Sequence, residues 1–167
     1  MTNQEWAHAE PAPPNLDSAP AIAVRAENKV FLVGKVSTGV QIYKCNGTAW
    51  VFDHPEATLV GDNGKKIIKH FAGPTWQAKD GSTVKAAAEA SVKVDATAIS
   101  WLRLKTTSAA AGPGGDRLAR TTYIQRVNTG GGVAPNGGIC DSTVDKEARV
   151  PYTADYYFWK ATGPGAP

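Results

Sequence analysis

Apolar residues along most of this chain come in short runs of strand length, separated by glycine, proline and asparagine. The first run is Val-Phe-Leu-Val at 30–33, and residues 99–105 alternate, with Leu102 and Leu104 on one side and Arg103 on the other. Short strands with a turn roughly every 8–12 residues are typical of antiparallel sandwiches and barrels. The pattern predicts an all-β fold, a single antiparallel β-sandwich or β-barrel of about eight to nine strands with little helix.

The clearest turn signal is Asn46-Gly47, between β-rich runs at residues 40–45 and 48–53. Asn-Gly in this setting predicts a two-residue type I′ hairpin, because both turn positions need a positive φ. The resulting register has four cross-strand pairs: Cys45 with Thr48, Tyr43 with Trp50, Ile42 with Val51, and Gln41 with Phe52. Both faces of the hairpin are then apolar, which favours a central place in the sheet.

A second Asn-Gly pair, Asn63-Gly64, predicts another hairpin, between residues 57–61 and 65–71. Its register has three pairs: Val60 with Ile67, Leu59 with Ile68, and Ala57 with His70.

Residues 85–94 are ambiguous, because their alanines favour helix whereas Val92 and Val94 suit a strand. No cap precedes this run and no helical apolar stripe crosses it, so we expect a strand. Further strands are predicted at 121–127 and 152–160, and glycine-rich loops at 108–116 and 128–141.

A chain of 167 residues fits one domain with its own core. Residues 1–28 contain four prolines and little apolar content, so we expect an extended proline-rich N-terminal arm. Residues 29–160 are the predicted β domain, and residues 161–167 a flexible tail.

The charge pattern narrows the possible partners. The net charge of +3 is spread along the chain, and the densest basic stretch, Lys65 to Lys69, contains Ile67 and Ile68. This stretch is typical of a solvated strand face, so we expect no nucleic-acid partner. No apolar run reaches about 18 residues, so no transmembrane segment is expected. Ala7-His8-Ala9 has the form of a signal-peptidase site, although no apolar h-region precedes it, so the signal peptide itself is taken to be absent.

The two cysteines, Cys45 and Cys140, lie far apart and fit no metal-ligand spacing. In an exported protein they would pair, closing a loop of about 95 residues and contributing roughly 4–5 kcal/mol. In a cytosolic protein they would be two buried thiols.

Several segments, taken in order, resemble a known family. They are GVQIYKC at 39–45, Trp50, PEATL at 55–59, HFAGPTW at 70–76, DGS at 80–82, ISWL at 99–102, TYIQRVNT at 122–129 and VPYTADYYF at 150–158. Together they resemble the exported bacterial and fungal proteins grouped as domain of unknown function 3455, over about residues 26–160. Ser100 departs from the family pattern, which usually has proline before Trp-Leu.

The resemblance implies an exported protein made with a signal peptide, in which Cys45 and Cys140 are bridged. It implies no activity. Some relatives carry a malate dehydrogenase label, but this sequence has no Gly-x-Gly-x-x-Gly after a strand and no alternation of strands with helices.

One group of side chains suggests chemistry. The second hairpin's register places His70 near His54 and Glu56, and two imidazoles with a carboxylate could bind a divalent metal or act as an acid/base pair. Successive strand residues face opposite sides, so a shared site requires a bulge near Pro55. Alternatively, His70 bonds a backbone carbonyl beside Gly73-Pro74 and has no catalytic role.

Aromatic residues suggest binding. Tyr156 and Tyr157 are neighbours and point to opposite faces of a strand, so the aromatic residues cannot all share one core. Exposed aromatic platforms bind sugars, other flat ligands or partner surfaces. The residues expected to form such a surface are Trp76, Trp101, Tyr152, Tyr157 and Trp159.

Three functional hypotheses follow, in order of preference. The first is a secreted or periplasmic, non-enzymatic module that binds a small molecule, glycan or surface through aromatic residues. The second is a small metal-assisted or acid/base enzyme centred on His54, Glu56 and His70. The third is a structural protein that self-associates. No cofactor is expected, apart from a divalent metal under the second hypothesis.

Overall fold

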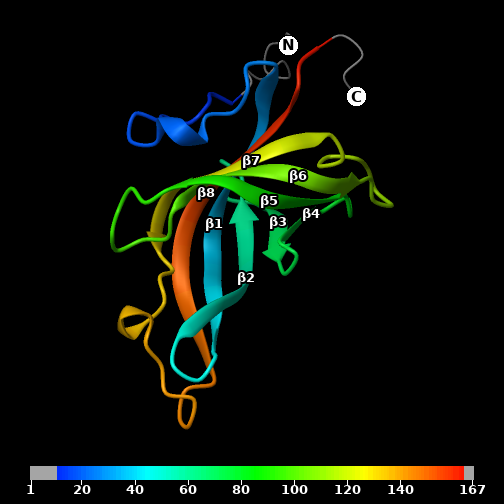
Figure 1. Cartoon of the computed structure of the whole chain (residues 1–167). Coiled ribbons are helices and arrows are strands. Elements are labelled where there is room, and N and C mark those ends of the chain that lie inside the picture. The colour runs from blue at the N-terminus through cyan, green and yellow to red at the C-terminus, as the bar shows by residue number, and fades with distance from the viewer. Residues whose placement is uncertain (1–10, 164–167) are drawn as a thin grey trace.

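The structure is a computed structural model that describes residues 11–163 (Figure 1). Eight strands form one closed antiparallel barrel, in which each strand pairs with the next along the chain and the last pairs with the first. They are β1 (Asn28–Cys45), β2 (Trp50–Val60), β3 (Lys66–Phe71), β4 (Thr75–Ala78), β5 (Thr83–Val92), β6 (Trp101–Ala110), β7 (Thr121–Gly131) and β8 (Glu147–Ala161). The all-β prediction is confirmed, and the fold is the barrel rather than the sandwich.

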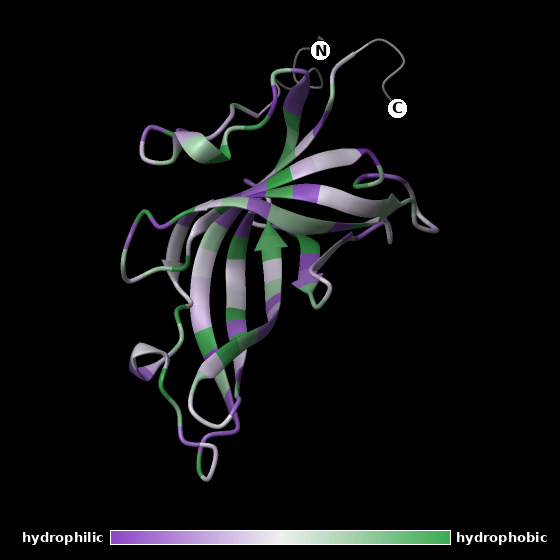
Figure 2. Cartoon of the chain, viewed as in Figure 1, coloured by the Kyte–Doolittle hydropathy of each residue, from purple (hydrophilic) through white to green (hydrophobic). Residues whose placement is uncertain are grey.

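Side chains alternate between the interior and exterior of the barrel, as the pleat of a strand requires. In β8, Tyr156 and Phe158 belong to the central core, whereas Tyr157 and Trp159 pack in separate outer clusters. Figure 2 shows this alternation as apolar and polar bands along the strands. The opposite orientation of Tyr156 and Tyr157, expected from the sequence, is thus present.

The register predicted for the first hairpin is wrong. Cys45 pairs with Trp50, and Tyr43 pairs with Phe52. The backbone N–H of Asn46 donates to the Ala49 carbonyl at 3.0 Å, so the connection has four residues rather than two. Asn46 does not have the positive φ that a type I′ turn needs; instead its side-chain oxygen accepts backbone N–H groups of the same turn. A bulge between Ile42 and Tyr43 shifts the pairs further along.

The second hairpin is confirmed in part. Ala57 opposes His70 and Leu59 opposes Ile68, as predicted. Val60, however, pairs with Lys66 instead of Ile67. The cause is the turn, in which Gly64 donates its N–H to the carbonyl of Gly61 at 2.9 Å and has a φ of 76°. A left-handed glycine after a tight turn adds one residue and forms a bulge.

Other boundaries differ only at strand ends. The ambiguous residues 85–94 are a strand, β5, as expected. Strands β6 and β7 both extend into residues predicted to be loops, ending at Ala110 and Gly131. Strand β8 begins at Glu147, five residues before the predicted start at residue 152.

The described part of the N-terminal arm, from residue 11 onward, runs along the outer wall of the barrel, and its turn at residues 20–22 packs next to β5 and β6 (Figure 1). A short 3-10 turn, η2 (Pro20–Ile22), places Ile22 at 0% exposure in a cluster with Trp101 and Val127. Arg103 donates from Nη1 to the carbonyls of Ala21 and Ala23, at 3.0 Å each. The arm therefore covers apolar strand residues that would otherwise face solvent.

One end of the barrel is closed by the β4–β5 and β6–β7 connections. The carboxylate of Asp80 accepts three hydrogen bonds: from the Ser82 backbone N–H and hydroxyl, at 2.8 and 2.6 Å, and from the Arg117 N–H, at 2.9 Å. These bonds, the Ser82 hydroxyl first, lower the pKa of Asp80. The two connections touch, since a Cβ on Gly112 would lie 2.2 Å from the carbonyl carbon of Gly81.

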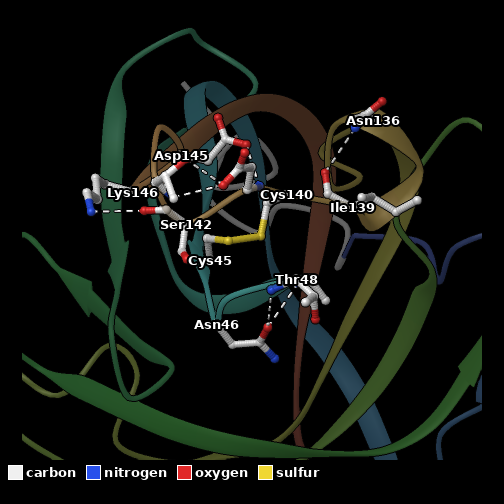
Figure 3. The surroundings of a disulfide bond; sticks show 12 residues. Cys45, Asn46, Thr48, Asn136, Ile139, Cys140, Ser142, Asp145 and Lys146 are labelled. Carbon is white, nitrogen blue, oxygen red and sulfur yellow. Dashed lines mark hydrogen bonds between the residues drawn. A yellow bond between two sulfur atoms is a disulfide. The ribbon is translucent and has the colours of Figure 1, made fainter.

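At the other end, β1, β2 and β8 extend beyond the remaining strands, and a disulfide fastens their tip (Figure 1). Cys45, the last residue of β1, is bonded to Cys140, and their Cα atoms are 6.0 Å apart. Figure 3 shows the bond between the β1–β2 turn and the long β7–β8 connection. The pairing implied by the family resemblance is confirmed.

Candidate functional site

A cavity of about 550 Å³ lies in the barrel interior, at the end opposite the Asp80 connections. It is lined by residues from all eight strands and from the β3–β4 turn. Space is left because β5 contributes only alanine methyl groups, from Ala86 to Ala88, where other strands contribute large side chains. The alanines that made residues 85–94 ambiguous in the sequence thus leave the space for the cavity.

Aromatic rings form one wall of the cavity. The His70 and Trp76 rings are stacked, with centroids 4.2 Å apart and planes 17° apart. Tyr156 packs against both rings, with its centroid 5.2 Å from that of His70 and 5.7 Å from that of Trp76. All three residues are almost completely buried and line the cavity. Such a wall suits a flat apolar ligand.

His70 is neutral in the folded protein. Its Nδ1 lies 2.9 Å from the Thr75 carbonyl oxygen, which can only accept, so Nδ1 carries the proton and Nε2 presents a lone pair. Burial, the largest cause, and the positive charge of Arg126 together lower the pKa of His70 to about 3, although the Thr75 hydrogen bond acts in the opposite direction. The ring is therefore a hydrogen-bonding, uncharged part of the wall at neutral pH.

Two buried polar atoms of the cavity-lining residues have no hydrogen-bond partner within residues 11–163. They are Nε1 of Trp76, a donor, and Oε1 of Gln41, an acceptor. Trp76 is 1% exposed and Gln41 is 3% exposed. Leaving a buried polar group unpaired costs about 1–3 kcal/mol, and folded proteins rarely do so without a reason.

Arg126 brings a positive charge to the cavity. Its Nε and Nη2 donate to the Ser100 carbonyl at 3.0 and 2.8 Å, which fixes the guanidinium in place. No carboxylate forms an ion pair with Arg126 among the described residues. Burial raises the pKa of Tyr156, and the charge of Arg126 opposes that rise.

A second hollow, of about 430 Å³, adjoins the first on the side of the β7–β8 connection and shares Gln41, Phe52 and Arg126 with it. Lys93 lies on its wall and donates to the Ala98 carbonyl. This hollow is more open to solvent than the inner cavity and is called the vestibule below.

Residues 25–160 match the family described as Protein of unknown function (DUF3455). The chain belongs to this family. No curated protein and no solved structure matches it. Within the described part of this DUF3455 member, no helix is long and apolar enough to cross a membrane. Ala7-His8-Ala9 lies outside the residues that the structure describes.

The structure divides the histidine group expected from the sequence. His54 and Glu56 lie together on the outer face of β2, with His54 Nε2 3.3 Å from Glu56 Oε2 and His54 Nδ1 2.5 Å from Asp53 Oδ2. Glu56 also accepts from Arg149 at 2.7 Å. His70 points to the interior and bonds the Thr75 carbonyl, as expected if it has no part in a shared site with His54 and Glu56. Within residues 11–163, no group of three or more His, Cys, Asp or Glu side chains is arranged to hold a metal ion.

The expected aromatic surface is also divided. Trp76 and Tyr152 are buried in the barrel core. Trp101, Tyr157 and Trp159 belong to clusters on the outer wall. Trp76 lines the cavity, and Tyr152 supports it by placing its hydroxyl 3.0 Å from that of Tyr156. Burial raises the pKa of Tyr152.

Sequence reasoning missed Gln41, Arg126 and Tyr156 as cavity residues. A signal for Arg126 was present, since it follows Ile124 by two positions and so shares its face of β7. A charged residue on the apolar face of a strand is a marker of an interior site. No comparable signal existed for Gln41, whose position depends on the bulge in β1.

Proposed function

We propose that this protein is a non-enzymatic binding module whose ligand is a small, flat and largely apolar molecule held in the barrel cavity. The observation that carries the proposal is the pair of unpaired buried atoms, Trp76 Nε1 and Gln41 Oε1, on residues that line a cavity of about 550 Å³. Small-molecule sites combine an apolar cavity of this size with a few convergent polar groups.

Binding explains why the unpaired groups persist. Both atoms lie beneath the cavity wall with no exposed surface of their own, so a ligand that accepts from Trp76 and donates to Gln41 would satisfy both once the lining side chains shift, with its rings in the space beside Tyr156. Methionine or leucine at position 41 would avoid the cost of an unpaired amide, so the amide has a use that folding alone does not supply. The alanine methyl groups of β5 leave the space in which such a ligand fits.

The disulfide supports a place of action outside the cytosol. Bonds of this kind form and persist in oxidising compartments and are rare where thiols are kept reduced. We infer that the protein is exported and binds its ligand there.

The test uses prodan, a neutral naphthalene dye whose emission shifts to the blue in apolar surroundings. We expect saturable binding of one dye per chain. Ala88→Trp should abolish it, because Ala88 is an exposed residue that lines the cavity, and an indole at this position would fill the opening.

Ala109→Trp is the matched control, since Ala109 is an exposed β-strand alanine that does not line the cavity. It should bind prodan as the unaltered protein does. Absence of saturable binding, or equal binding by the Ala88→Trp protein, would overturn the proposal.

A further inference from the structure

The charges around the cavity define the class of ligand more closely, an inference that rests on the proposed function. Two cations line the cavity and its vestibule, Arg126 and Lys93. The acidic residue on these walls is Asp53, at the rim, and its carboxylate is already engaged 2.5 Å from His54 Nδ1. His70 is neutral and Tyr156 is protonated, so neither adds a charge at neutral pH. Counted together, the walls of the cavity and the vestibule carry two cations and one carboxylate, so positive charge is in excess.

Arg126 is held ready for an anion. The Ser100 carbonyl fixes the guanidinium through two of its N–H groups, and an arginine has five in a rigid fork. Another N–H group interacts with the Tyr156 hydroxyl, and those left over can donate to a ligand without the entropy loss of ordering a free side chain. No carboxylate of residues 11–163 forms an ion pair that would neutralise it.

Trp76 holds a second donor beneath the wall of the same cavity, where a shift of the lining side chains would present it. Its Nε1 is buried without a partner, and it packs edge-on against Tyr156, the residue that interacts with Arg126. An anionic oxygen is the group that accepts most strongly from such donors. We propose that the ligand is a flat apolar molecule with a single anionic group, of the carboxylate type, whose charge is held by Arg126 and whose rings lie along Trp76 and Tyr156.

The test is displacement of bound prodan by two molecules with the same body, anionic 2-naphthoate and neutral 2-naphthamide. We expect 2-naphthoate to displace the dye at a concentration roughly tenfold lower, the difference between a charge-assisted and a neutral hydrogen bond. Arg126→Gln should bring the two displacement constants close together while prodan still binds. Lys105→Gln, which removes a charge from an exposed residue outside the cavity, should leave the preference unchanged.

Equal displacement by the two naphthalenes in the unaltered protein, or stronger displacement by the amide, would overturn the inference. Because prodan is neutral, its binding does not depend on the proposed charge selection. Failure of prodan to bind would instead overturn the proposed function. If Arg126→Gln does not fold, Arg126→Lys should keep a preference for 2-naphthoate, and the comparison in the unaltered protein decides the inference by itself.

Discussion

Two regions of this barrel each contain a buried tryptophan and a buried glutamine, but the side chains are hydrogen-bonded in one region and lack partners in the other. On the outer wall, Trp159 donates from Nε1 to Gln125 Oε1 at 2.8 Å, and Gln125 donates from Nε2 to the Ile22 carbonyl at 2.9 Å. In the cavity, Trp76 Nε1 and Gln41 Oε1 have no partner within residues 11–163. Burial is similar, since Gln125 is 0% exposed and Gln41 is 3% exposed.

The difference separates a structural hydrogen-bond network from the candidate binding site. On the outer wall the polar groups satisfy one another and attach the arm to the barrel, so nothing further is needed. In the cavity, Trp76 Nε1 and Gln41 Oε1 are buried at a cost without a partner among the described residues, and we propose that a ligand supplies it. Residue type and burial would not distinguish the two regions, but the hydrogen-bond partners do.

The largest expected effect is on the outer wall. Ile22→Ala should lower the free energy of unfolding by roughly 3–4 kcal/mol, because Ile22 is fully buried between the arm and the strands. Urea unfolding measures the change. Prodan affinity should not change, since Ile22 does not line the cavity.

Ala21→Ser, at the exposed neighbouring residue, is the control and should alter stability by less than about 0.5 kcal/mol. A parallel loss of stability and prodan affinity in Ile22→Ala would show that the two regions are not independent.

The next largest effect is expected from a substitution that breaks the hydrogen bonds of Gln125 on the outer wall. Gln125→Met keeps the length of the side chain but leaves Trp159 Nε1 and the Ile22 carbonyl without a partner. We expect a loss of roughly 2–3 kcal/mol in urea unfolding. An unchanged free energy of unfolding would mean that these hydrogen bonds contribute little to stability. Hydrogen-bond pairing would then not distinguish the outer wall from the cavity.

A third effect concerns pH. In the unfolded chain His70 takes up a proton near its ordinary pKa of 6.5, whereas in the folded protein its pKa is about 3. The unfolded state therefore binds more protons between these values, and stability falls as the pH falls through this window. Between pH 7 and pH 5 the loss from His70 should be about 2 kcal/mol.

His70→Asn keeps a donor for the Thr75 carbonyl and removes the titration. Its urea midpoint should thus change less between pH 7 and pH 5 than that of the unaltered protein. Carboxyl groups with lowered pKa values, such as Asp80, act at lower pH and do not obscure this range. Equal changes in the two proteins would contradict a buried, neutral His70.

The sequence predicted the strands better than their partners. Alternation and turn residues identified the β segments, and the Leu59–Ile68 and Ala57–His70 pairs followed from the position of Gly64. The pairs of the first hairpin did not follow, because Asn46 uses its side chain to cap a longer turn. Turn type depends on such local competition, and an Asn-Gly pair allows more than one outcome.

The candidate site was less predictable than the fold. His70 and Trp76 were both named from the sequence, but in different groups; the β3–β4 hairpin makes them direct cross-strand partners and so stacks their rings. His54 and His70 face opposite ways because Ala57 opposes His70 and His54 lies three residues from Ala57 along β2. The cavity depends on contributions from every strand, and no local pattern encodes which of their small side chains will meet.

The smallest expected change in stability is an increase rather than a loss. Gln41→Met removes an acceptor that has no partner, and it keeps the length of the side chain, so stability should rise by about 1 kcal/mol. The same substitution at Gln125 lowers stability, because there the amide is paired at both ends. The two substitutions should also differ in their effect on binding. Gln41→Met should weaken the displacement of prodan by 2-naphthamide, because the N–H group of the amide loses its acceptor. Gln125→Met should leave this displacement unchanged. If Gln41→Met were as destabilising as Gln125→Met, the cavity amide would have a structural partner, and the contrast between the two walls would fail at its central residue.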